Sequence, residues 1–170
     1  MSRTSIISLS SAALLVLAAL ALAGCGGGGS AARPTTKDGR PATLGVANDN
    51  LGKVLVNSQG RTLYLFKKDS GTMSNCTGAC ATDWPPLRAN GKPTVGTGTN
   101  ASLVGTIMRT DGKPQVTYNN HPVYLFVGDG KAGDTKGQGV SAFGASWFAL
   151  SPAGNQVSGQ PASSGGGYGY

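Results

Sequence analysis

One motif occurs twice in this chain, and its repetition constrains the fold more than any other feature of the sequence. Each copy has an apolar stretch, a polar turn, a Tyr-Leu-Phe segment, an aspartate and then a tryptophan. The first copy comprises Val54–Val56, Tyr64, Phe66, Asp69 and Trp84, and the second comprises Gln115–Thr117, Tyr124, Phe126, Asp129 and Trp147. The tyrosine, phenylalanine and aspartate recur at a constant offset of sixty residues. Two units of the same layout favour a fold built from two equivalent halves.

Each unit predicts a strand, a tight turn and a second strand. Along Leu63–Phe66, Tyr64 and Phe66 point to one face and the two leucines to the other, so both faces are apolar and the strand belongs inside the protein. A third turn, at Asp111-Gly112, joins a predicted strand over 103–108 to the strand at Val116. The sequence also allows a short helix near Thr77 to Asp83.

A single hairpin is marginally stable in water, so neither unit should fold alone. We therefore predict an all-β domain, in which the two hairpin-based repeats pack with approximate two-fold symmetry into one small sheet or sandwich. The folded domain should span about residues 43–154, with repeat 1 near 45–90 and repeat 2 near 101–152.

The first 24 residues have the layout of a signal peptide. Arg3 precedes an apolar run from Ile6 to Ala23, which ends at Leu22-Ala23-Gly24-Cys25. This ending resembles a lipobox, at which bacterial lipoproteins are acylated on cysteine and cleaved, so we predict lipidation of Cys25. The alternative is an uncleaved anchor helix, because the run has about the length needed to span a bilayer.

Glycine-rich segments flank the predicted domain. Residues 25–42 read as a lipidated tether and 155–170 as a disordered tail. The formal charge is +7 for the whole chain, and loss of Arg3 leaves the mature side chains near +6. Because the basic residues are scattered, we expect no nucleic-acid partner. The diffuse charge could help the domain to lie near anionic envelope polymers, although ordinary solubility explains it as well.

Three cysteines become an even number in an exported protein if Cys25 carries lipid. Cys76 and Cys80 then form the remaining pair, and a structural disulfide is the preferred interpretation. Three residues separate them, unlike the two of a thioredoxin-like pair, and no histidine follows as haem attachment would need. A redox or copper-handling role remains an alternative, since Met73, Met108 and His121 could add soft or imidazole ligands.

The repeated Tyr-x-Phe-x-x-Asp, with the stretch from Asn75 through Cys76 and Cys80 to Trp84-Pro85-Pro86-Leu87, resembles the bacterial secreted-repeat lipoproteins. The resemblance covers residues 45 to 152. It implies a predicted lipoprotein without an established biochemical activity. A third possibility, an accessory role in hydrocarbon (alkane) utilisation, follows from association with some members of that family alone.

The remaining candidates for chemistry each have a structural explanation. His121, the only histidine, precedes Pro122 in a turn, and the chain contains no glutamate, which disfavours a hydrolase. Asp69 and Asp129 read as caps of the turns that follow them, with cation binding as the alternative. The glycines from Gly128 to Gly133 match a dinucleotide-binding pattern, but no helix follows.

The aromatic residues of the motif could line a binding platform, but core packing is the preferred interpretation. For Trp84 and Trp147 both interpretations stay open, because a tryptophan beside prolines is often partly exposed. Taken together, the sequence predicts a lipid-anchored envelope protein, on the outer face of the cell membrane or in the periplasm or outer membrane. We expect a non-catalytic binding or structural role, without catalytic residues, metal or cofactor. Partners would be the membrane, through the anchor, and envelope polymers or another envelope protein.

Overall fold

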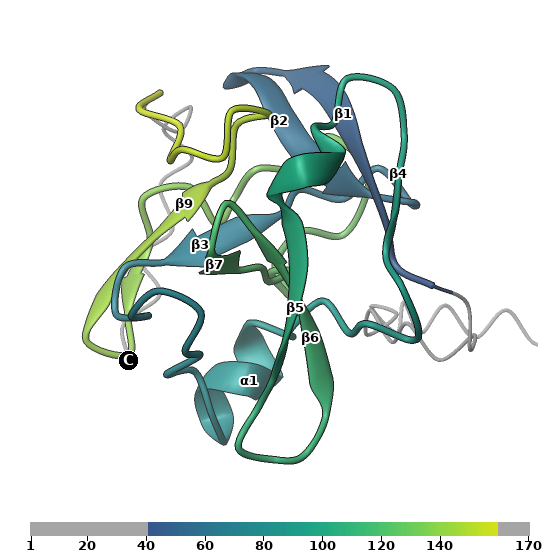
Figure 1. Ribbon diagram of the computed structural model, residues 1–170. Helices are drawn as coiled ribbons and strands as arrows, with labels where there is room; N and C mark the ends of the chain where they lie inside the picture. The colour runs from purple at the N-terminus through teal and green to yellow at the C-terminus, as the bar shows by residue number, and fades with distance from the viewer. Residues whose placement is uncertain (1–40, 160–170) are drawn as a thin grey trace, which may run out of the picture. The chain divides into compact units, whose positions relative to one another are not determined.

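The computed structural model describes residues 41–159 (Figure 1). The predicted signal peptide, the predicted tether as far as Arg40, the predicted tail beyond Gly159, and Cys25 lie outside the described residues. The elements of the described part are β1 Thr43–Asp49, β2 Gly52–Asn57, β3 Tyr64–Phe66, α1 Ala79–Asp83, β4 Thr94–Val95, the 3-10 helix η1 Ala101–Leu103, β5 Val104–Met108, β6 Pro114–Tyr118, β7 His121–Pro122, β8 Ser141–Ala142 and β9 Ala145–Ala149. Strands dominate, which confirms the all-β prediction.

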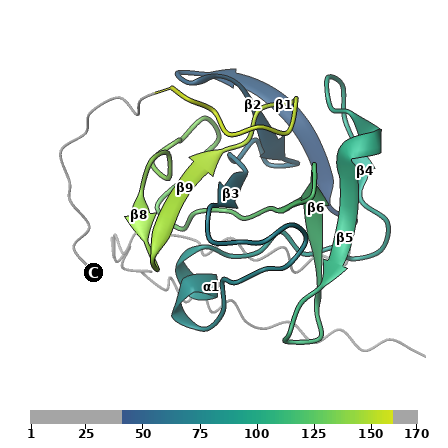
Figure 2. The ribbon, with the colours of Figure 1, turned by 60° about the vertical axis from the view of Figure 1, so that its left-hand side comes forward.

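Three small sheets organise these strands, in the orders β2-β1-β4, β3-β9-β8 and β5-β6-β7. Two antiparallel hairpins, β1–β2 and β5–β6, contribute one sheet each, and the short β3 lies between them (Figure 2). The predicted turn at Asp111-Gly112 joins β5 to β6, with Gly112 at a φ of 71°. Asn119 and Asn120, between β6 and β7, also have positive φ values, as a tight hairpin turn requires.

The two repeats exchange their Tyr-Leu-Phe segments. β3 of repeat 1 pairs with β9 of repeat 2, which places Phe66 opposite Trp147. The corresponding segment of repeat 2 pairs with the region after α1 of repeat 1, where Leu125 N–H donates to Pro85 C=O. Where the two segments meet, Tyr64 and Tyr124 exchange backbone hydrogen bonds of 2.9 and 3.0 Å.

The residue three positions after each tryptophan completes this exchange. Leu150, after Trp147, accepts from Leu55 N–H and donates to Leu63 C=O, so it bridges the two strands of repeat 1. Leu87, after Trp84, accepts from Val116 N–H and donates to Val123 C=O in repeat 2. Because each repeat supplies hydrogen bonds that the other needs, the two halves form one interleaved unit.

The segment Val123–Phe126 is not a continuous strand, contrary to the prediction. Only Tyr124 forms ladder bridges, to Tyr64 and to Pro86. The N–H groups on either side donate to different segments, Val123 to Val116 and Leu125 to Pro85. The segment therefore changes partners at each residue and cannot form a regular ladder with any of them.

Two buried clusters lie on opposite sides of the exchanged segments, as the alternation of their side chains predicts. The tyrosines and phenylalanines of the motif pack with both tryptophans, Val54, Val56 and the two cysteines. Leu63, Leu65, Val123 and Leu125 belong to the second cluster, with Leu44, Leu55, Leu87, Val116, Tyr118 and Leu150. Within residues 41–159, no helix has the length and apolar character needed to span a bilayer.

Candidate functional site: the aromatic stack and its tyrosine–aspartate pairs

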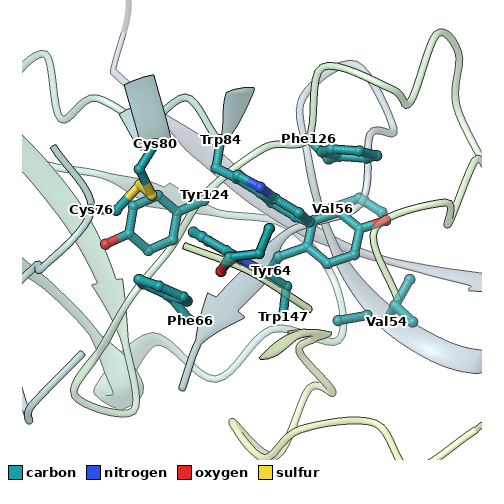
Figure 3. Packing of buried hydrophobic residues seen from close by; sticks show 12 residues of the cluster. Val54, Val56, Tyr64, Phe66, Cys76, Cys80, Trp84, Tyr124, Phe126 and Trp147 are labelled. Carbon is teal, nitrogen blue, oxygen red and sulfur yellow. Dashed lines mark hydrogen bonds between the residues drawn. A yellow bond between two sulfur atoms is a disulfide. The ribbon is translucent and has the colours of Figure 1, made fainter. Parts of the chain in front are cut away.

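Four aromatic rings of the repeated motif form a continuous stack in the first cluster (Figure 3). Trp84 and Trp147 stand at its centre, with ring centroids 3.9 Å apart and an interplanar angle of 5°. Phe66 stacks on Trp147 at 4.0 Å, and Phe126 stacks on Trp84 at 4.2 Å. Each phenylalanine thus contacts the tryptophan of the other repeat.

The two motif tyrosines pack against the stack by their edges. Tyr64 meets Trp84 at 81°, and Tyr124 meets Trp147 at 87°, both favourable geometries for aromatic pairs. Both tryptophans are completely buried, which decides the open question of their exposure in favour of the core. The prolines after Trp84 do not force the ring outward, because Pro86 itself forms a bridge to Tyr124 inside the fold.

Each motif tyrosine donates its hydroxyl hydrogen bond to the motif aspartate of the other repeat. Tyr64 Oη donates to Asp129 Oδ2, and Tyr124 Oη donates to Asp69 Oδ2, both at 2.7 Å. The other carboxylate oxygen of each aspartate accepts a backbone N–H from the loop that follows, from Lys136 or from Asn75. The aspartates therefore organise their loops, as predicted, and also join the repeats, which was not predicted.

The Tyr64–Asp129 pair lies deep in the protein. Asp129 is 1% exposed and Tyr64 is fully buried. Burial raises the pKa of Asp129 to about 6, against the opposing effects of the hydrogen bonds from Tyr64 and Lys136 and the charge of Arg61. Burial, followed by the charge of Asp129, raises the pKa of Tyr64 far above its ordinary range, so the phenol remains a donor.

The Tyr124–Asp69 pair is more accessible and belongs to a larger polar network. Burial raises the pKa of Asp69, although its side chain is partly exposed. Ser74 Oγ lies 2.8 Å from Tyr124 Oη and accepts from Arg109 Nη1 at 2.6 Å. Since Tyr124 donates to Asp69, the serine hydroxyl must donate to Tyr124, and the bonds run in one direction from Arg109 to Asp69. The network is thus one continuous chain of hydrogen bonds, formed by Arg109, Ser74, Tyr124 and Asp69.

A disulfide links Cys76 and Cys80, next to this network. Cys76 lies at the end of the loop after Asp69, and Cys80 lies in α1, which carries the chain towards Trp84. Arg109 of repeat 2 donates through Nη2 to the carbonyl of Cys76 at 2.6 Å and through Nη1 to Gln115. The disulfide loop of repeat 1 is thereby fastened to repeat 2.

The residues proposed as copper ligands lie in different settings. Met73 and Met108 are 62% and 70% exposed, whereas both cysteines are buried and their sulfurs are bonded to each other. Soft thiolate ligands would therefore exist only after reduction. His121 is partly buried in β7, and burial followed by the charge of Lys67 lowers its pKa. In the described residues, no group of three or more His, Cys, Asp or Glu could hold a metal ion.

The glycine-rich loop after Asp129 already contains an anionic group of the protein. Asp134 Oδ2 accepts the backbone N–H groups of Gly130 and Lys131, at 2.9 and 3.2 Å. Such paired N–H groups resemble a phosphate-binding loop, but here a side-chain carboxylate occupies the position of the ligand. This geometry agrees with the rejection of a dinucleotide site.

The motif residues therefore use their side chains for contacts with one another and with the loops of the domain. Their rings stack, their hydroxyls meet carboxylates, and their carboxylates hold loops. Arg61 also belongs to this arrangement, because its Nη2 donates to Phe126 C=O at 2.6 Å, and the sequence analysis did not identify it as a site residue. A buried arginine before a Tyr-Leu-Phe strand has no distinctive sequence signal, since exposed turn arginines look the same.

Comparison with known protein families identifies a family for this chain. The chain matches the family described as a secreted repeat of unknown function over residues 45–88 and again over 105–151, together more than half of its length. The protein belongs to this family, which confirms the family resemblance and the two repeats. No curated protein and no solved structure matches the chain.

Proposed function

We propose that the protein is a lipid-anchored component of the bacterial cell envelope with a non-catalytic binding or structural role. The anchor rests on the apolar run and the Leu22-Ala23-Gly24-Cys25 ending, and the family description of a secreted repeat supports export. Acylation with two or three chains would hold the protein stably at a membrane, on the outer face of the cell membrane or in the periplasm or outer membrane.

The non-catalytic part of the proposal rests on one observation, that the residues of the repeated motif contact one another inside the protein. A catalytic tyrosine–aspartate pair needs access to substrate and a proton that it can exchange near its working pH. Here Tyr64 is fully buried, Tyr124 is also fully buried, and both hold their protons towards an aspartate of the other repeat. Partners would therefore meet the outer surface of the domain, and envelope polymers or another envelope protein are the candidates.

Cys25→Ser tests the anchor. When extracts of cells that express the wild type are partitioned with detergent, the protein should enter the detergent phase and should have the mass of a cleaved and acylated chain. The variant should lose both the acyl mass and the partition. Replacement of Cys76 and Cys80 by serine is the matched control, because it removes two cysteines and leaves the anchor intact. A Cys25→Ser protein with the processed mass and partition of the wild type would contradict the proposal.

The non-catalytic part has its own test. Asp69→Asn and Asp129→Asn should lower the stability of the domain while binding to isolated envelopes persists at temperatures where the variants are folded. Loss of envelope binding in a folded variant would instead place the function in the motif itself.

A further inference from the structure

The outer edge of β5, meaning its side that faces away from β6, has backbone groups without partners among residues 41–159. Thr106 lies opposite Val116, whose N–H and C=O bond Leu87 and Val123 on the far side of β6. Arg109 N–H, by contrast, donates to Lys113 C=O across the hairpin. Because inward and outward residues alternate along an antiparallel strand, Val104, Thr106 and Met108 direct their backbone groups outward.

Only one of these outward groups is satisfied inside the described part of the chain. Val104 N–H donates to Ala101 C=O at the end of η1. The carbonyl of Val104 and both backbone groups of Thr106 and Met108 have no protein partner within residues 41–159. The outer edge of β5 therefore presents two donors and three acceptors in a row.

The equivalent edge in repeat 1 is protected. There β4 covers the beginning of β1, with Thr94 N–H donating to Ala42 C=O and Gly96 N–H to Leu44 C=O. The segment that follows repeat 2 does not repeat this, because it turns back and Val157 N–H donates to Ala149 C=O. Of these two equivalent edges, the edge of β1 is covered at its beginning by β4, and the edge of β5 is uncovered within the described residues.

The side chains of β5 do not protect its edge either. Natural edge strands are usually blunted by charged residues or proline, and Val104–Met108 contains neither. Met108 is 70% exposed at the end of the strand. The tail beyond Gly159 contains Pro161 and four glycines, which makes it a poor candidate for a covering strand.

We propose that the outer edge of β5 pairs with the same edge of a second copy of this chain, antiparallel and with the two-fold axis at Thr106. In this register each Thr106 exchanges two hydrogen bonds with its counterpart, and each Met108 N–H donates to Val104 C=O of the other copy. The two donors and the acceptors they need are thus matched, in spite of the blocked Val104 N–H.

The sequence of β5 fits this register. Met108 lies opposite Val104 of the second copy, which covers the exposed methionine with an apolar neighbour. Ile107 lies opposite Gly105, so a large side chain faces the smallest one. No charges are brought together. The interface is isologous, as in most homodimers, and its small extent makes it a weak and concentration-dependent contact.

Thr106→Lys tests the pairing in the full-length chain, purified in detergent. Sedimentation at rising protein concentration should show a wild-type dimer, whereas the variant should remain a monomer because two like charges meet at the axis. Ser141→Lys is the matched control, since Ser141 is exposed on β8, the edge strand of another sheet. The control should dimerise like the wild type, and both variants should melt as the wild type does.

A second measurement keeps the proposal testable if Thr106→Lys fails to fold. Thr106→Cys in membranes should yield a cross-linked dimer with a short thiol-reactive linker, while Ser141→Cys should yield none. A wild type that is monomeric at every concentration, a dimer that survives Thr106→Lys, or equal cross-linking at both positions would overturn the proposal. Cross-linking of the Thr106→Cys variant to an extended segment of a different protein would also overturn the proposal.

Discussion

Removal of one hydroxyl group from each motif tyrosine should have unequal effects. Tyr64→Phe deprives Asp129, which is 1% exposed, of a 2.7 Å hydrogen bond and leaves a buried carboxylate with less compensation. A hydrogen bond to a charged group contributes ~1.5–3 kcal/mol net, so we expect a loss of ~2–3 kcal/mol. Tyr124→Phe removes an equally short bond, but Asp69 is partly exposed and water can replace the donor. Tyr124→Phe should therefore lower the free energy of unfolding by only ~1 kcal/mol, as for the loss of a hydrogen bond between neutral groups.

Urea unfolding of the three proteins at pH 7.5 and 4.5 measures this difference. Because the pKa of Asp129 is about 6, its carboxyl group is charged at the higher pH and protonated at the lower. The cost of Tyr64→Phe should therefore shrink on acidification, since hydrogen bonds between neutral groups are about half as strong. Tyr118→Phe is the control: its hydroxyl donates to Pro152 C=O, and its cost should not depend on pH. Equal costs for both motif tyrosines, or a pH-independent cost for Tyr64→Phe, would refute the reasoning.

Three further predictions concern packing, charge and covalent linkage. Gly137→Ala should cost ~1–3 kcal/mol of stability, because a Cβ there would lie 2.8 Å from a motif tyrosine ring, whereas Gly45→Ala, with its nearest neighbour at 3.7 Å, should be nearly neutral in the same denaturation assay. The folded-state pKa of Asp129 is raised, so this carboxyl group should contribute increasing stability as the pH falls from about 6 towards 4, and Asp129→Asn should remove that contribution, measured as the difference in melting temperature between variant and wild type against pH. Replacement of Cys76 and Cys80 by serine should lower stability by ~2 kcal/mol without abolishing the fold, as expected for a short closed loop and measurable by urea unfolding.

The sequence was sufficient to predict the core but not the exchange between the repeats. Alternation along Leu63–Phe66 identified the two faces correctly, because burial of both faces leaves a direct trace in residue type. The pairing of β3 with β9 leaves no such trace. An apolar strand can pair with its own repeat or with the other, and tertiary packing alone decides between them.

The polar connections were also beyond the sequence. A repeated aspartate after a strand is equally compatible with a turn cap, a cation ligand or a partner for a distant tyrosine. Only the fold brings Asp129 within 2.7 Å of Tyr64, which is 65 positions away in the chain. The exposure of the tryptophans stayed open for the same reason, because proline neighbours describe the local chain and not the stack that encloses the rings.

The central claim is that the two repeats share one core and cannot unfold separately. Phe66→Ala and Phe126→Ala test it most directly, since each phenylalanine stacks on the tryptophan of the other repeat. Truncation of a buried aromatic costs ~3–5 kcal/mol. Urea unfolding should show comparable losses for both variants, each in a single cooperative transition. Separate transitions for the two halves would contradict the shared core. So would a loss of stability below ~1 kcal/mol in both variants, because truncation of a buried ring costs more than that.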